Sequence, residues 1–145
     1  MRGFTLLELL IAVAIIAIVS STLVVKAWPD AAASADSEAR RLAALLESAI
    51  SEARTSGQAI AWSPEGSGYA FWRRNAEGAW THFPEDSVYR PRLLAAGAVL
   101  RSERVVLVPY GMAGGIEAAV SGGNTTIIIR SGALGRVSLE RIHAD

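Results

Sequence analysis

The sequence predicts an α+β protein in which a long N-terminal helix packs on an antiparallel β-sheet. Three features of the chain lead to this prediction. Residues 9–25 carry no charge, residues 42–53 place apolar side chains at helical spacing, and the chain after Gly57 consists of short extended runs between glycine-rich turns. A helical period that changes to a period of two indicates a helix followed by strands.

The first part of the helix, residues 4–27, is predicted to cross a membrane. Every side chain of residues 9–19 is apolar, and residues 9–25 correspond to about 25 Å of helix. With residues 4–8 included, the segment reaches the length that spans a bilayer. Lys26 and Trp28 follow it, and such residues are typical of a membrane interface.

Two other interpretations of this segment stay open. A secretory signal peptide needs a cleavage site of small residues after its apolar core, which Ala27 or residues 31–33 could supply. The length of the apolar run argues against a signal peptide, and so does Glu8, because such signals carry basic residues at that position. An ordinary single-span anchor is the other alternative, and it accounts for Glu8 no better.

The second part of the helix, residues 28–57, is predicted to be an amphipathic helix of the soluble domain. Its apolar side chains fall at i, i+3, i+4, i+7, i+8 and i+11, which places them on one face of a helix. Gly57 is a candidate C-cap. The apolar stripe needs a surface to pack on, and it consists of Leu42, Leu45, Leu46, Ala49, Ile50 and Ala53.

The remaining residues, 58–145, are predicted to form an antiparallel β domain. The expected strands lie at residues 59–63, 69–74, 80–83, 105–108, 116–120, 125–129 and 136–142. Turn signals separate them at residues 63–68, 75–78, 121–124 and 131–135. The indole rings of Trp62, Trp72 and Trp80 are expected to fill the core between the sheet and the helix.

The composition argues against several classes of function. The chain has 14 basic and 14 acidic residues, so no overall field attracts it to nucleic acid. The absence of cysteine excludes disulfides and thiolate metal sites. The sequence contains no glycine-rich phosphate loop, metal-ligand motif or nucleophile elbow, so we predict neither an enzyme nor a bound cofactor or metal. Glu85 and Asp86 are expected to lie in a solvated turn.

The most specific motif is the stretch GFTLLELL at residues 3–10. Its Glu8 stands at the start of the apolar run, and a charge near a bilayer centre costs about 2.5–3.5 kcal/mol. The motif resembles the N-terminus of type IV pilins and of the pseudopilins of type II secretion. This resemblance implies that residues 1–3 are a leader, that a prepilin peptidase cuts after Gly3, and that the new terminal residue, Phe4, is N-methylated.

The resemblance also suggests a role for Glu8 in filament assembly. Cleavage leaves a terminal amine on Phe4 at the membrane edge, and in a filament this amine enters an apolar bundle of helices. A carboxylate on the adjoining helix can neutralise it, so that the two costly groups meet only in the assembled state. Fixing register is the best attested use of such buried pairs. Glu8 is therefore predicted to act in assembly and not in catalysis.

Two further segments resemble the H-type minor pseudopilins, the GspH/FimT group. Residues 45–62 are similar to its helix-to-first-strand segment, and residues 105–141 are similar to its last strands. The resemblance implies a pilin-like fold and a minor pseudopilin of a type II protein secretion system, a structural subunit of the pseudopilus that helps to move exoproteins across the outer membrane.

The implied setting is the inner membrane, crossed once, with the C-terminal domain in the periplasm. The implied partners are the major pseudopilin, the other minor pseudopilins and the prepilin peptidase, which is also the methyltransferase. The alternative is a minor pilin of a type IV pilus with a role in pilus priming or DNA uptake. Nucleic-acid binding is not expected, because basic pairs such as Arg73 and Arg74 are usually solvated surface.

Overall fold

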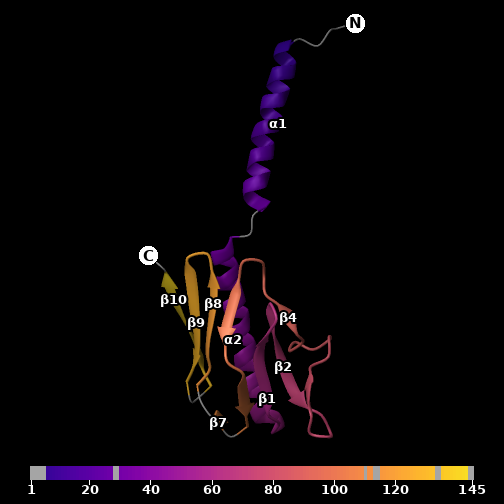
Figure 1. Ribbon diagram of the computed structural model, residues 1–145, viewed down its shortest axis with the longest axis vertical. Coiled ribbons are helices and arrows are strands. Elements are labelled where there is room, and N and C mark those ends of the chain that lie inside the picture. The colour runs from indigo at the N-terminus through magenta and orange to yellow at the C-terminus, as the bar shows by residue number, and fades with distance from the viewer. Residues whose placement is uncertain (1–5, 28–29, 110, 113–114, 133–134, 144–145) are drawn as a thin grey trace.

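The computed structural model describes residues 6–27, 30–109, 111–112, 115–132 and 135–143, with the side chains of residues 19–27 and 111–112 left out of the description. Two helices, α1 (Leu6–Ala27) and α2 (Ala31–Ser56), precede all the strands. Figure 1 shows α1 extending away from one end of a body that α2 and the strands form. The predicted α+β class, with a helix on antiparallel strands, is confirmed.

Local signals set both ends of α2. The Asp30 side chain accepts hydrogen bonds from the backbone nitrogens of Ala32 and Ala33, at 3.0 and 3.4 Å, and so caps the helix start. At the other end Gly57 has φ of 70°. This left-handed conformation favours glycine, which has no Cβ, and it confirms the predicted C-cap.

The strands form two antiparallel sheets. The first sheet has the order β3-β2-β1-β6-β7, with β4 paired to β2, and the second has the order β10-β9-β8-β5. The strands of the first sheet are β1 (Ile60–Glu65), β2 (Gly68–Arg74), β3 (Trp80–His82), β4 (Arg92–Leu93), β6 (Val105–Val108) and β7 (Gly111–Met112). Those of the second are β5 (Val99–Ser102), β8 (Glu117–Gly122), β9 (Thr125–Ser131) and β10 (Val137–His143).

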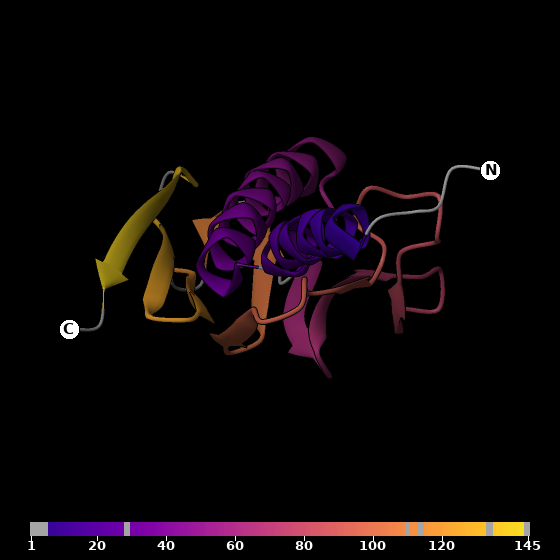
Figure 2. The ribbon, with the colours of Figure 1, turned by 90° about the horizontal axis from the view of Figure 1, so that it is seen from above.

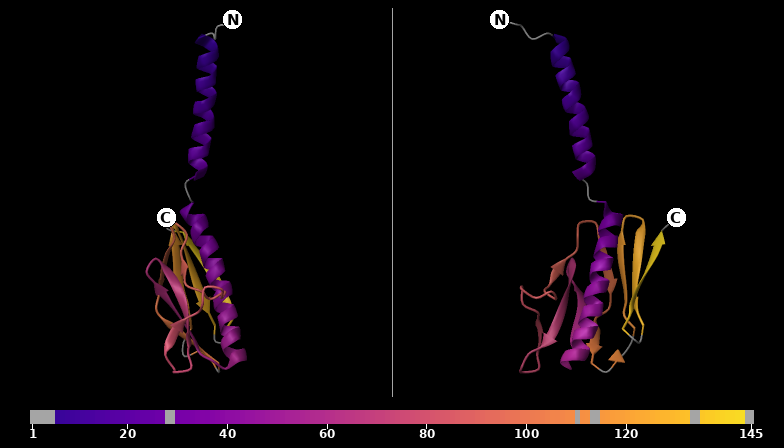
Figure 3. Two further views of the ribbon diagram at one scale, coloured as in Figure 1. Left: turned by 90° about the vertical axis from the view of Figure 1, so that its right-hand side faces the viewer. Right: turned by 180° about the vertical axis from the view of Figure 1, so that it is seen from behind.

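Helix α2 covers one face of both sheets, as Figures 2 and 3 show from three sides. Its predicted apolar stripe supplies the helix side of the core, where Leu42 and Leu46 have no exposed surface. Trp62 of β1 and Phe71 of β2, also fully buried, come from the first sheet, and Ile129 of β9 comes from the second. Fully burying one such aliphatic or aromatic side chain stabilises the fold by about 1.5–3 kcal/mol.

The strand predictions need three corrections. The sequence predicts one sheet, whereas the strands form two. The second sheet includes β5, which pairs with β8 and not with the strands next to it in sequence. The short strands β4, β5 and β7 were not predicted. The turn expected at residues 63–68 is a two-residue loop, because β1 and β2 pair as far as Glu65 and Gly68.

The prediction that three indole rings fill the core is wrong for two of them. Trp62 is fully buried, but Trp72 and Trp80 are only partly buried. Successive side chains of a strand point to opposite faces. Phe71 faces α2, so Trp72 lies on the far face of the first sheet.

Candidate assembly site

Apart from Glu8, the described side chains of α1 are all apolar, and they cover this part of the helix on every side. All the described side chains of this helix, at residues 6–18, are exposed. Leu6 is 85% exposed, Leu10 65% and Ile16 63%, so no part of the folded domain covers them. A helix that is apolar all round is normally found buried in a large core or in a bilayer. This surface therefore requires lipid or other apolar helices around it.

Over the residues that the structure describes, no helix is both long enough and apolar enough to cross a membrane. The membrane-spanning segment inferred from residues 4–27 of the sequence therefore stays a prediction.

Glu8 lies in the first turn of α1, and its side chain is exposed. It is the one charged residue between positions 6 and 25 of the sequence. A carboxylate in the first turn interacts favourably with the positive end of the helix dipole. The other two predicted site residues, Gly3 and Phe4, lie outside the described residues.

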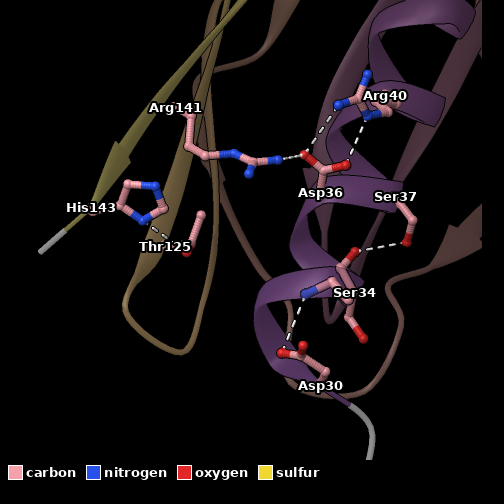
Figure 4. Close-up of polar contacts among 9 residues, drawn as sticks. Asp30, Ser34, Asp36, Ser37, Arg40, Thr125, Arg141 and His143 are labelled. Carbon is pink, nitrogen blue, oxygen red and sulfur yellow. Dashed lines mark hydrogen bonds and ion pairs between the residues drawn. The ribbon is translucent and has the colours of Figure 1, made fainter.

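The domain end nearest α1 is held by charged contacts that sequence reasoning did not identify. Figure 4 shows the Asp36 carboxylate of α2 between Arg40 and Arg141. Arg40 Nε donates to Asp36 Oδ2 at 2.7 Å, and Arg141 of β10 forms an ion pair with Oδ1. These hydrogen bonds, from Arg40 first and Arg141 second, hold the pKa of Asp36 below its ordinary value. The last strand is thus fixed to the helix.

A buried carboxylate on α2 binds the backbone of the segment that connects β4 of the first sheet to β5 of the second. Glu38 is only 4% exposed, pairs with Arg41, and accepts a hydrogen bond from the backbone nitrogen of Ala95 at 3.2 Å. One turn further along the sequence, position 42 belongs to the apolar stripe. That spacing places Glu38 on the buried face of α2 and could have identified it from the sequence. The segment before β5 is therefore fixed to the same helix.

None of these contacts forms a catalytic or metal-binding arrangement. Among the described residues, no group of three or more histidine, aspartate or glutamate side chains is placed to hold a metal ion. Glu85 and Asp86 lie in an exposed turn, as predicted. The contacts instead fix β10 and the segment before β5 to α2.

Comparisons with known families agree with this arrangement. Residues 1–24 match the prokaryotic N-terminal methylation motif. Residues 38–141 match the family described as type II transport protein GspH. The chain belongs to the GspH family. It is thus a minor pseudopilin of type II secretion, and the family is structural and not enzymatic.

Two solved structures have a similar fold. Both are of the minor pseudopilin EpsH from the type II secretion system of Vibrio cholerae. The first has 18% sequence identity and a TM-score of 0.57, and the match covers 79% of this chain and 98% of EpsH. The second has 15% identity and a TM-score of 0.53, and the match covers 80% of this chain and 97% of the EpsH chain. No curated protein sequence matches the chain.

The GspH family and the methylation motif also support coarser statements about processing and partners. The motif implies processing by a prepilin peptidase and suggests anchoring in the inner membrane, while GspH family membership implies partners in pseudopilus assembly. The GspH match favours type II secretion over the type IV pilus alternative.

Proposed function

We propose that this pseudopilin is cut between Gly3 and Phe4, methylated on Phe4, and assembled into the pseudopilus through α1. Residues 4–27 would cross the inner membrane once, and residues 28–145 would form the periplasmic domain. The observation that carries the proposal is the exposed apolar surface of α1, with its single carboxylate at Glu8, in a chain that matches the methylation motif.

Glu8 gives assembly its register. In the membrane before assembly, its carboxylate stays near the polar boundary. When α1 packs beside the helices of other pseudopilins, the Phe4 ammonium of one subunit pairs with a carboxylate on the next. A buried charge without a partner is strongly unfavourable, so the pair forms only where the two helices align. Correct alignment is thereby favoured over shifted alignments.

The domain and α1 have separate tasks in this proposal. Helix α1 supplies the contacts along the filament axis with the major pseudopilin and the other minor pseudopilins. The β domain, fixed to α2, supplies the lateral contacts. The assembled pseudopilus then helps to move exoproteins across the outer membrane, with energy supplied by another component of the system.

The test of the assembly role is Glu8→Gln, with Glu52→Gln as the control. Glu52 is an exposed carboxylate on α2, so both variants remove one charge. We expect the amount of Glu8→Gln protein that cross-links to the major pseudopilin in membranes to fall at least about tenfold, because leaving a buried charge unpaired costs roughly 3–5 kcal/mol. Unfolding of the domain should not change. Wild-type cross-linking by the Glu8 variant would refute the role.

A further inference from the structure

A row of rings and charged groups crosses the face of the first sheet that points away from α2. Trp72 and Arg74 of β2 are two residues apart and share this face. Arg74 is paired in register with Trp80 of β3, and Trp72 with His82. Arg104, the residue before β6, contacts the Trp72 and Trp80 rings. The row therefore combines residues from three strand regions.

At one end of the row, the side chains contact one another and their neighbours on β1. The rings of His82 and Trp72 are stacked with their centroids 3.7 Å apart. His82 Nε2 lies 3.0 Å from the Glu65 carboxylate, and Trp72 Nε1 donates to Ser63 Oγ at 3.3 Å. The polar groups at this end therefore find partners within the domain.

The other end has two guanidinium groups on one indole ring. The guanidinium carbon of Arg74 lies 5.1 Å from the centroid of Trp80, and that of Arg104 lies 5.5 Å from the same centroid. Arg104 also lies 5.8 Å from Trp72. Cation–π contacts of this kind hold the guanidinium groups in place while their N–H donors remain available.

Among the described carboxylates, none is paired with either guanidinium. Within the part of the chain that the structure describes, the arginines that form ion pairs are Arg40, Arg41, Arg130 and Arg141. Neither Arg74 nor Arg104 is among these arginines. Both side chains are exposed, so their guanidinium groups are accessible to another molecule. The two positive charges of Arg74 and Arg104 therefore lie at the Trp80 ring with no described carboxylate paired to either.

We propose that Arg74, Trp80 and Arg104 form a clamp that binds the carboxylates of an acidic segment of a partner protein. A guanidinium presents paired N–H donors that match the two oxygens of a carboxylate. The clamp can accept one or two carboxylates, and together they would complete the row as Glu65 does at its other end. Nucleic acid fits less well, because binding a run of phosphates needs a longer basic track, and the chain has no net charge.

The test uses the full-length chain in detergent and a capped oligoglutamate peptide, titrated while tryptophan fluorescence is recorded. The variant is the double substitution Arg74→Gln and Arg104→Gln. Its control is Arg54→Gln with Arg136→Gln, which removes two other exposed arginines outside the clamp. An oligoglutamine peptide and a single-stranded oligonucleotide serve as the other probes.

The wild type and the control should bind oligoglutamate, and the clamp variant should bind it about tenfold more weakly or worse, since a charged hydrogen bond contributes about a factor of ten. Oligoglutamine should not bind.

Absence of oligoglutamate binding, equal weakening in the control, or tighter binding of the oligonucleotide would each overturn the proposal. If circular dichroism shows that the double variant is unfolded, the two single variants replace it, and unchanged affinity in both would also overturn the proposal.

Discussion

Helices α1 and α2 are consecutive and similar in length, yet their apolar side chains have opposite surroundings. In α1, Leu6 and Leu10 are 85% and 65% exposed. In α2, Leu42 and Leu46 have no exposed surface, because both sheets pack against them. The apolar surface of α2 is thus used within the domain, whereas that of α1 is available for contacts with other molecules.

This difference separates folding from assembly. The domain has its own core, capped helix and ion pairs, none of which involves the described side chains of α1. Changes in α2 should therefore alter the stability of the domain, and changes in α1 should alter incorporation into the filament. Each prediction below tests one side of that separation.

The largest effect is expected from Leu46→Ala in α2. Removing this fully buried side chain should lower the free energy of unfolding by about 2–5 kcal/mol, since it leaves a cavity in the core. The matched change, Leu10→Ala in α1, should alter domain unfolding by less than about 0.5 kcal/mol. Denaturant unfolding followed by tryptophan fluorescence measures both. Similar losses of unfolding free energy in the two variants would show that α1 also contributes to the stability of the domain.

A smaller effect is expected where the β8–β9 hairpin meets the start of α2. A Cβ added at Gly122 would lie 2.0 Å from the carbonyl oxygen of Ala31. Gly122→Ala should therefore destabilise the domain by about 1–3 kcal/mol, as overpacked cores do. At Gly132 an added Cβ meets no atom within 4 Å, so Gly132→Ala serves as the control. Thermal unfolding of both variants should show a loss only in the first, and equal melting would contradict this close packing.

The smallest effect is expected from the exposed contact between Asp36 and its two arginines. The folded-state pKa of Asp36 is lowered, so its stabilising contribution is present above the unfolded pKa of about 3.9. That contribution is lost as the pH falls through the folded value. Wild type and Asp36→Asn should differ slightly in stability at pH 6 and converge in more acidic solution. A difference that grows below pH 4 would contradict the assigned direction.

Local patterns were sufficient to predict α2 and most of the hairpins. The i, i+3, i+4 stripe and Gly57 lie within single elements, and the structure confirms both. The strand β5 was missed because its partner, β8, is not the next strand along the chain, since β6 and β7 lie between them in sequence. Two-residue strands such as β4 are too short to show any period. Division into two sheets depends on such long-range pairing, and not on a local signal.

The misplaced indoles and the missed Glu38 show a second limit of sequence reasoning. Trp72 and Trp80 are large and apolar, so they were assigned to the core, although arginine side chains cover them on the far face. Glu38 is charged, yet it is buried because Arg41 and a backbone nitrogen satisfy it. Residue type alone does not determine the face of an element, whereas strand alternation and helical spacing do.

The N-terminal residues of the mature protein test the central claim most directly. The full-length chain, coexpressed with a prepilin peptidase, would be isolated from membranes and its intact mass measured. The account predicts loss of Met1, Arg2 and Gly3 and the addition of one methyl group on Phe4, and it predicts no cleavage of Gly3→Val, because a branched side chain obstructs the close approach that glycine permits. A wild-type protein that keeps Met1 and carries no methyl group would contradict the account, since Glu8 would then have no new ammonium to bind.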